Sequence, residues 1–236
     1  MATYVMSDIH GDYDSYIKML EMIKFSSEDT MYIIGDILDR GEHPIKVLLD
    51  VMSRPNMVFI IGNHELMFCE CMKFLMQEIT DESIESLDED TADALMNWMY
   101  NGAEPTIKEF RGLSWDKRKE VKDFILESDV YEEINVAGTD YLLVHAGFDN
   151  YSPEKELWEY EIEELVWRRP DYHTDFFNGT HVIMGHTPTQ LIEDAPNPGY
   201  IYYCGNNTVI DCGCSSPSGR LGCLRLDDGK EFYVEK

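Results

Sequence analysis

The feature that most constrains the fold is a repeated pairing of a short apolar run with a polar, glycine-containing segment. The five polar segments are, in chain order, Asp8-Ile9-His10-Gly11, Gly35-Asp36-Ile37-Leu38-Asp39-Arg40-Gly41, Gly62-Asn63-His64-Glu65, His145-Ala146-Gly147 and Gly185-His186-Thr187-Pro188. The apolar, β-prone runs before them are 3–6, 31–34, 57–61, 141–144 and 182–184. Rigid strands hold the loops that follow them, so functional side chains gather at strand ends. The pattern therefore predicts an α/β (α+β) protein whose chemistry lies at its strand ends.

The order of periodic segments predicts how the chain is organised. Strands are expected at 3–7, 31–35 and 57–61, and helices at 14–24, 43–53 and from residue 64 onward. This βαβαβ order indicates neighbouring strands joined by right-handed crossovers. Helical periodicity continues over roughly 66–129, and later come hairpin turns at 138–140 and 227–229 and a helix near 153–166. A chain of this length is expected to form one domain, 1–236.

Charge and hydropathy exclude several classes of partner. The 19 basic and 46 acidic residues give a formal net charge of −27, which disfavours a nucleic-acid partner. No apolar run approaches the ~20 residues needed to span a bilayer, and no signal peptide is visible before the first strand. Six cysteines in a chain of this size indicate reduced thiols and a cytoplasmic location. The two C-x-C pairs do not have the C-x₂₋₄-C spacing of structural zinc sites.

Two further features are interpreted as ordinary surface. The strongly acidic run 78–90 is expected to be a solvated loop, with an acidic recognition lid as the alternative. His43, His173 and His181 lie outside the five polar segments, and we expect a surface or packing role for each.

Side chains in the polar segments have the chemistry of a site for two divalent metals. The six candidate ligands are Asp8, His10, Asp36, Asn63, His145 and His186. Asp8 and His10 alternate at a strand end, so both can bind one ion. Asp36 has two carboxylate oxygens and can bridge two ions, and the last three residues can complete the second. Oxygen and imidazole ligands without thiolate suit Mn²⁺, Fe or Zn²⁺, and two ions about 3.5–4 Å apart can activate a bridging water.

Three neighbouring residues are candidates for roles in substrate binding and proton transfer. His64 follows the candidate ligand Asn63 and can protonate a leaving alkoxide. Asp39 lies three residues after Asp36, within reach to orient that imidazole. Arg40 offers a planar pair of donors to phosphate oxygens, and a second arginine comes from Trp167-Arg168-Arg169.

Together these segments resemble the calcineurin-like metallophosphoesterases, and within them the phosphoprotein phosphatases of the bacteriophage lambda and bacterial type. The matching segments are Asp8-x-His10, Gly35-Asp-x-x-Asp-Arg-Gly41, Gly62-Asn-His-Glu65, Asn101-Gly102 after Trp98, Val166-Trp167-Arg168-Arg169, Gly185-His186-Thr187-Pro188 and Ile210-Asp211-x-Gly213. The resemblance spans nearly the whole chain. It implies a central β-sandwich flanked by helices, the metallophosphoesterase fold.

The resemblance also implies roles for individual residues. One ion would be bound by Asp8, His10 and Asp36, and the other by Asp36, Asn63, His145 and His186. His64 would be the general acid and Asp39 its partner. Arg40 and Arg169 would bind phosphate, with Arg169 favoured over the adjacent Arg168.

Three functions are compatible with these residues. The favoured hypothesis is a Mn²⁺-dependent phosphatase that hydrolyses phosphoserine or phosphothreonine in proteins by direct attack of a metal-bridging water. The alternative is hydrolysis of symmetric dinucleoside tetraphosphates, an activity of a sister group with similar motifs. Asp39-Arg40 and Glu65 favour the phosphatase. A non-catalytic scaffold would be expected to have lost ligands or His64, and none is lost.

Overall fold

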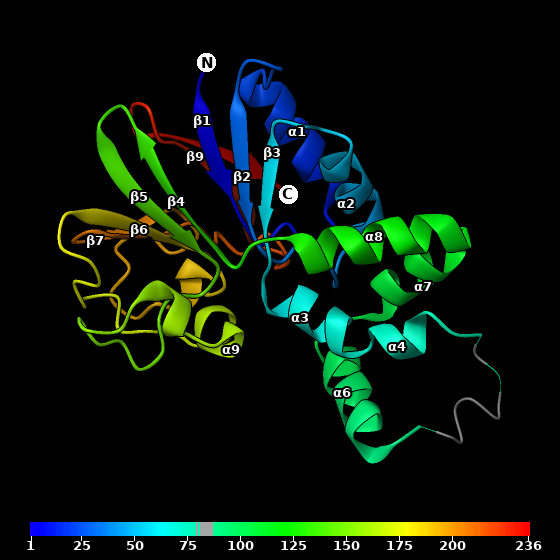
Figure 1. Ribbon diagram of the computed structural model, residues 1–236. Helices are drawn as coiled ribbons and strands as arrows, with labels where there is room; N and C mark the ends of the chain where they lie inside the picture. Colours follow the sequence, from blue (N-terminus) through cyan, green and yellow to red (C-terminus); the bar gives the residue numbers. More distant parts are fainter. Residues whose placement is uncertain (79, 81–86) are drawn as a thin grey trace.

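The protein is built around two five-stranded β-sheets with helices against their outer faces (Figure 1). The computed structural model describes residues 1–78, 80 and 87–236. The acidic run 78–90 therefore lies mostly outside the described residues, but Glu89 and Asp90 at its end begin a helix and do not belong to a loop. Among the described helices, none has both the length and the apolar composition that crossing a bilayer requires.

The first sheet has the strand order β10-β9-β1-β2-β3. Its strands are β1 (Thr3–Met6), β2 (Thr30–Ile34), β3 (Met57–Ile60), β9 (Arg220–Arg225) and β10 (Lys230–Glu235). The neighbours β1, β2 and β3 are parallel, as the βαβαβ prediction requires. The C-terminal hairpin β9–β10 joins antiparallel to the free edge of β1, with Met6 opposite Cys223. The expected turn at 227–229 connects these last two strands.

The second sheet has the order β4-β5-β6-β8-β7. Its strands are β4 (Tyr131–Val136), β5 (Thr139–Val144), β6 (Thr180–Met184), β7 (Tyr202–Cys204) and β8 (Asn207–Val209). The central strands β5, β6 and β8 are parallel, and the hairpins β4–β5 and β7–β8 are antiparallel. Gly138, with φ 89°, makes the predicted turn between β4 and β5. Each sheet thus has three parallel strands that end at one edge.

Helices cover the sheets and extend beyond the strand ends. They are α1 (Tyr13–Ile23), α2 (Pro44–Met52), α3 (Asn63–Glu70), α4 (Met72–Leu75), α6 (Glu89–Tyr100), α7 (Glu104–Gly112), α8 (Trp115–Glu127) and α9 (Ile162–Val166), with 3₁₀ turns at Leu157–Glu159 and Thr189–Leu191. Figure 1 shows α1 and α2 beside the first sheet, and α3, α4, α6 and α7 beyond the lower ends of its parallel strands.

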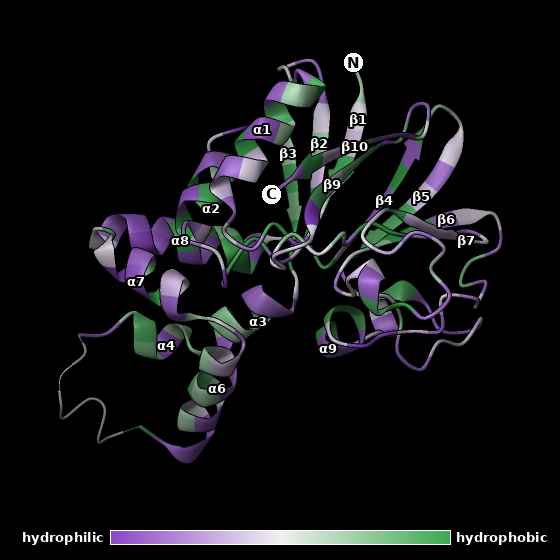
Figure 2. Ribbon diagram, turned by 180° about the vertical axis from the view of Figure 1, so that it is seen from behind, coloured by the Kyte–Doolittle hydropathy of each residue, from purple (hydrophilic) through white to green (hydrophobic). Residues whose placement is uncertain are grey.

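The local sequence explains where the helices form. In α1 the buried residues Tyr16, Met19, Leu20 and Ile23 recur at helical spacing, so one stripe faces the sheet. Asp12 caps the helix because its carboxylate accepts a hydrogen bond from the Ser15 amide at 3.0 Å. In Figure 2, β3 is largely hydrophobic, whereas the outer surfaces of α7 and α8 are largely hydrophilic.

The predicted helix near 153–166 is wrong in its extent. Only Leu157–Glu159 and Ile162–Val166 are helical, and Tyr160 between them has extended backbone angles. Its ring is buried and lies edge-on to Phe148 with centroids 5.3 Å apart. Burying this aromatic ring in the cluster outside the second sheet breaks a segment that local periodicity would make continuous.

An apolar layer between the two sheets joins them. Its buried members are Val5, Ile34, Ile60, Val136, Leu143, Ile183, Ile201, Ile210, Cys212, Leu224 and Leu226, which come from both sheets. β-branched residues dominate this layer because they pack well on pleated surfaces. The central β-sandwich flanked by helices is therefore confirmed.

Truncating one side chain in this layer should show how strongly it holds the sheets together. Ile183 on β6 is 1% exposed, so Ile183→Ala should lower the free energy of unfolding by about 2–5 kcal/mol through lost burial and a residual cavity. Chemical denaturation followed by circular dichroism would measure the loss. Leu126→Ala on α8, where the side chain is 59% exposed, is the control and should change stability by less than about 0.5 kcal/mol.

Candidate metal centre

The predicted site residues converge where the parallel strands of both sheets end. Asp8 follows β1, Asp36 follows β2, Asn63 begins the helix after β3, His145 follows β5 and His186 follows β6. The Gly185 amide donates to the His145 carbonyl at 2.7 Å, and the Asp8 amide donates to the Gly35 carbonyl at 3.1 Å. The loops are thus bonded to one another, and all six candidate ligands are brought together.

The backbone at this edge has an unusual conformation. Nine non-glycine residues of the described chain have positive φ. Six of them are predicted site residues: Asp8, His10, Asp36, Asp39, Arg40 and His186. Left-handed backbone costs free energy for residues with a Cβ, and such residues cluster at functional sites where the surroundings enforce them. The conformation independently supports this edge as the candidate functional site.

Three imidazoles are fixed so that one nitrogen faces the centre. His10 donates from Nδ1 to the Leu38 carbonyl at 2.9 Å, and His145 donates from Nδ1 to the Ile34 carbonyl at 2.8 Å. His186 uses Nε2 to donate to the Trp167 carbonyl at 3.0 Å. In the neutral form of each ring, this bond selects the tautomer whose other nitrogen carries a lone pair. Metal-binding histidines are commonly oriented in this way.

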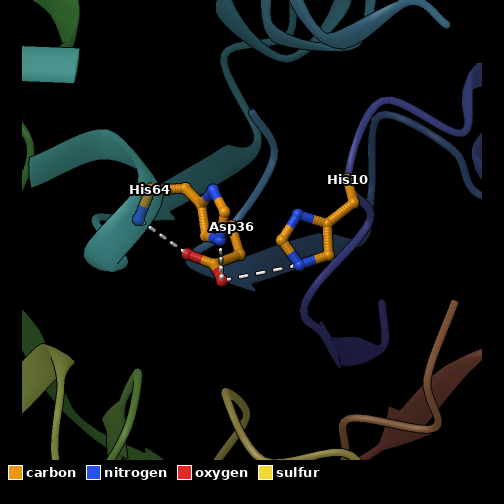
Figure 3. Close-up of side chains that lie close together, drawn as sticks. All are labelled: His10, Asp36 and His64. Carbon is orange, nitrogen blue, oxygen red and sulfur yellow. Dashed lines mark hydrogen bonds and ion pairs between the residues drawn. The ribbon is translucent and has the colours of Figure 1, made fainter. Parts of the chain in front are cut away.

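Asp36 lies between two groups that can each hold a metal ion. The first consists of His10, Asp36 and His64, and the second of Asp36, His145 and His186. Figure 3 shows the first group, in which Asp36 Oδ2 is 3.6 Å from His10 Nε2 and 3.8 Å from His64 Nε2. In the second group Asp36 Oδ1 is 3.3 Å from His145 Nε2. One carboxylate oxygen therefore faces each group, which is the bridging geometry.

Asn63 belongs to the second group through its side-chain oxygen. Asn63 Oδ1 is 3.1 Å from His145 Nε2 and 2.9 Å from His186 Nδ1. Three of the four atoms that would bind the second ion therefore already face one another.

Asp8 lies at the centre but outside both groups. Its Oδ2 accepts a hydrogen bond from the His186 amide at 3.0 Å. Burial raises the pKa of Asp8 to about 6, and the nearby Asp36 carboxylate adds to this shift. Buried Asp211, next to Asp8, has a pKa raised for the same two reasons, burial and a neighbouring carboxylate. Sequence analysis gave Asp211 no role beyond a family match.

The charges at the centre fit bound dications. Burial alone would lower the pKa of His145, but the carboxylates of Asp36 and Asp8 outweigh it and raise the pKa to about 10. His186 differs, because burial and the neighbouring His145 lower its pKa to about 3. Buried carboxylates that rely on protonated neighbours are a ready site for cations. The donors are carboxylate, amide and imidazole, without thiolate, and suit first-row divalent metals.

His64 and Asp39 form a closely coupled pair beside the first group. Asp39 Oδ2 lies 2.5 Å from His64 Nδ1, and both side chains have no exposed surface. Burial opposes a charge on His64, yet Asp36 and the hydrogen bond to Asp39 raise its pKa. The pair leaves His64 Nε2 facing the centre.

Two residues from the helical layer hold Asp39, and sequence analysis missed their role. Trp98 Nε1 donates to Asp39 Oδ2 at 2.7 Å, and Thr106 Oγ1 donates to Asp39 Oδ1 at 2.5 Å. Neither Trp98 nor Thr106 has exposed surface. The Gly102 carbonyl also accepts from the Arg40 amide at 2.9 Å. The only local signal for these contacts was the position of Trp98 just before Asn101-Gly102.

The arginines at the centre have different partners. Arg40 donates to His10 Nε2 and His64 Nε2, each at 2.9 Å, so a metal at His10 or a proton on His64 Nε2 requires this guanidinium to turn outward. Arg168 makes an ion pair with Asp149, Nε to Oδ2 2.9 Å. Arg169 has no carboxylate partner in the described chain, and its charge acts on His186. Of the adjacent pair, Arg169 is the freer guanidinium.

Two pockets open at the centre, and Arg40 lines both. The larger, about 670 Å³, we call the arginine pocket; it is lined by Asp36, Arg40, Asn63, Asn101, Asp149, Trp167, Arg168, Arg169, His186, Pro188 and Leu191. The smaller, about 350 Å³, we call the tyrosine pocket; it is lined by His10, Gly11, Asp12, Tyr13, Asp14, Arg40, Gly41, Glu42, His43, Lys46, Ser215 and Lys236. A ligand at the metal groups can therefore extend in two directions.

Comparison with known proteins gives a consistent result. The family model for calcineurin-like phosphoesterases matches residues 1–218. Symmetrical bis(5'-nucleosyl)-tetraphosphatases of Salmonella typhimurium and Salmonella typhi are 34% identical over 102 residues, covering 42% of this chain and 36% of theirs. The aligned part thus spans about a third of the length of these relatives.

Solved structures share the fold at low identity. One, provisionally described as a diadenosine tetraphosphatase, has a TM-score of 0.68 at 15% identity and covers 99% of this chain and 92% of its own. A protein serine/threonine phosphatase from Saccharomyces cerevisiae has a TM-score of 0.58 at 16% identity, covering 99% and 79%.

A metal titration would test the bridging position of Asp36. Calorimetric titration of metal-free protein with Mn²⁺ should give two ions per chain. Asp36→Asn should weaken both by at least about 10-fold, because the carboxamide removes the charge shared by the two groups. His186→Ala should weaken only one, and Asp228→Asn in the distant β9–β10 turn should weaken neither. A single ion whose affinity ignores His186 would contradict the two-ion assignment.

Proposed function

The chain belongs to the calcineurin-like phosphoesterase family, and from this we propose that it hydrolyses symmetric dinucleoside tetraphosphates at a dinuclear metal centre. The observation that carries the proposal is that the arginine and tyrosine pockets meet at Arg40 beside the candidate metal groups. A dinucleoside tetraphosphate cut symmetrically has one nucleotide on each side of the reacting phosphorus. A site for it needs room on both sides. The relatives named as symmetrical tetraphosphatases support the same choice.

The arginine pocket has the composition expected for a nucleoside polyphosphate. Arg168 and Arg169 supply positive charge for the phosphates, and guanidinium groups pair well with phosphate oxygens. Trp167, Pro188 and Leu191 provide apolar surface against which a base can pack. Leu191 is 64% exposed, so this surface is accessible.

The tyrosine pocket would hold the second nucleotide. Lys46 Nζ lies 3.7 Å from the centroid of the Tyr13 ring, which places an ammonium and an aromatic face together. Asp12 and Asp14 also line this pocket, and the charge it offers is therefore weaker than that of the arginine pocket. The two ends of a symmetric substrate would thus meet unlike surroundings.

We assign the catalytic roles as follows. The family resemblance implies Asp8, His10 and Asp36 for one ion, although the first group in the structure joins His10 and Asp36 to His64 and leaves Asp8 beside it. Asp36, Asn63, His145 and His186 would hold the other ion. When bound, the two ions supply positive charge to the phosphoryl oxygens and activate the attacking water. Arg40 and Arg169 would bind phosphate oxygens. His64, its Nδ1 held by Asp39, would donate a proton from Nε2 to the leaving oxygen.

Hydrolysis of phosphoserine or phosphothreonine in proteins is the second candidate. The buried His64–Asp39 pair favours it, because an alkoxide leaving group needs a proton more than a phosphate does. Asp39-Arg40 and Glu65, which favour the phosphatase in the sequence, give no further support from their contacts. Asp39 holds His64, and Glu65 holds backbone beside Asp36. Mn²⁺ is our proposed metal, with Fe or Zn²⁺ as alternatives.

A direct substrate comparison would decide between the two candidates. With Mn²⁺ present, kcat/KM for diadenosine tetraphosphate should exceed that for a phosphoserine peptide by at least about 10-fold. The nucleotide product should be ADP alone, because the cut is symmetric. Lys46→Ala in the tyrosine pocket should raise KM for the dinucleotide and leave hydrolysis of p-nitrophenyl phosphate unchanged. A preference for the phosphopeptide would instead favour the second candidate.

The proton donor can be tested by varying the leaving group. His64→Asn should lower kcat on phosphoserine by roughly 10²–10⁴-fold, and by much less on p-nitrophenyl phosphate, whose leaving group is a stable anion. Trp98→Phe removes one hydrogen bond to Asp39 and should give a smaller loss with the same substrate dependence. Metal content is measured in parallel. Equal losses on both substrates at full metal occupancy would exclude His64 as the general acid.

A further inference from the structure

A second cluster of reactive side chains lies on the second sheet, away from the metal centre. Cys204 ends β7, and its Sγ is 3.1 Å from His173 Nδ1. His173 Nε2 is in turn 2.6 Å from Asp194 Oδ2. A thiol, an imidazole and a carboxylate are thus joined in a line through the two nitrogens of one ring. We call these three residues the Cys204 triad.

The triad is independent of the metal centre in both position and partners. Cys204 pairs with Asn207 at the turn end of the β7–β8 hairpin, whereas the chain leaves the other end of β8 toward Asp211 and the metal centre. The loop that carries His173 is anchored separately, because Asn207 Nδ2 donates to the Tyr172 carbonyl at 2.8 Å and to the Thr174 carbonyl at 2.7 Å. Asn207 lies on β8, which pairs with the strand of Cys204, so β8 holds His173 next to the Cys204 thiol.

The carboxylate end of the triad is also held in place. Tyr202, two residues before Cys204 on the same strand, donates from its hydroxyl to Asp194 Oδ2 at 3.0 Å. Hydrogen bonds from His173 and Tyr202 lower the pKa of Asp194, which keeps this carboxylate charged. A carboxylate held at Nε2 keeps the imidazole oriented with Nδ1 toward the Cys204 sulfur, where Nδ1 can accept the thiol proton.

The triad has the arrangement that activates a nucleophile. A base within hydrogen-bond reach of a thiol, itself oriented by a third group, is the recurring pattern for activated cysteine. The side chains of His173 and Asp194 are 65% and 52% exposed, and Cys204 is partly exposed, so a small reagent can reach the sulfur. Cys69 is the natural comparison: it is also partly exposed, but burial raises its pKa to about 12.

We propose that Cys204 is a nucleophilic thiol and a site of covalent modification by small disulfides. The thiol proton passes to His173 Nδ1, and the thiolate attacks one sulfur of a disulfide R–S–S–R. A bond forms between Cys204 Sγ and that sulfur while the S–S bond breaks. The second sulfur leaves as RS⁻ and takes a proton from the His173 imidazolium. The cysteine is oxidised to a mixed disulfide, and one equivalent of RSH is released.

Charge around the triad selects the kind of disulfide. Asp171 accepts from the His173 amide at 3.0 Å, Asp175 accepts from Asn206 Nδ2 at 3.1 Å, and Asp194 belongs to the triad. These carboxylates, on a chain of net charge −27, attract a cationic reagent and repel an anionic one. The site is therefore suited to disulfides that carry amino groups.

The experiment measures mixed-disulfide formation on the full chain at pH 7. Protein is treated with cystamine, a dicationic disulfide, and modification of each cysteine is followed by peptide mass spectrometry. Cys204 should react at least about 10-fold faster than Cys69, and faster with cystamine than with oxidised glutathione, a gap that should narrow as salt rises. His173→Asn should slow Cys204 by about 10-fold, since an ordinary thiol is only a few per cent thiolate at pH 7.

Control variants separate activation from simple exposure. Asp194→Asn should slow Cys204 by less than His173→Asn, because the imidazole stays in place. His181→Asn, which changes a histidine of the same sheet outside the triad, should leave the rate unchanged. Thermal unfolding by circular dichroism checks that each variant is folded. If folded His173→Asn reacts at the wild-type rate, or if Cys204 reacts no faster than Cys69, the proposal is wrong.

Discussion

The candidate metal centre depends on one buried carboxylate, Glu65, which has no assigned role in the chemistry. Glu65, which has no exposed surface, accepts hydrogen bonds from four backbone amides: Asp36, Ile37, Leu38 and Gly62, at 2.8–3.0 Å. These amides belong to the loop after β2 and to the start of α3, so one side chain fixes the backbone of both. Burial raises the pKa of Glu65 to about 7, and the four donors are what make a charged carboxylate tolerable there. Asp36 is placed between its two metal groups because this loop cannot relax.

Residues of the helical layer hold Asp39 in the same way as Glu65 holds the loop after β2. Within the described chain, Asp39 receives its side-chain hydrogen bonds from residues distant in sequence: His64 on α3, Trp98 on α6 and Thr106 on α7. Phe68 and Phe110 pack edge-on behind them, with centroids 5.1 Å apart. Helices α3, α6 and α7 therefore position the candidate general acid, beyond covering the ends of the strands. A change in their packing should reach His64 through Asp39, because a buried hydrogen-bond network transmits displacement.

The sequence predicted the parts of the molecule that local patterns encode. Strand ends and crossovers follow from short segments, and β1–β3 and the first two helices lie within a residue of the expected bounds. The six predicted ligands converge at one edge, and their role in metal binding stays a prediction. β1 pairs with β9, more than 200 residues away, and such a distant pairing has no signal in the local sequence pattern. The β-sandwich was therefore predicted only from the family resemblance. The contacts of Trp98 and Thr106 with Asp39 were not predicted for the same reason, because they join residues 59 and 67 positions apart in the sequence. Local periodicity failed at Tyr160, where tertiary burial overrides it.

Electrostatics adds a reason for proposing a nucleotide substrate in place of an acidic peptide. A net charge of −27 opposes the approach of any phosphate compound, but salt screens that field beyond about 8 Å. Within that distance two bound ions would dominate together with the local arginines. Asp149 already neutralises Arg168, whereas Arg169 has no such partner among the described residues. A substrate that is negatively charged only at its phosphates places all of its negative charge next to these cations. An acidic peptide would instead extend its carboxylates over a surface of the same sign, so its affinity would fall as its length grows.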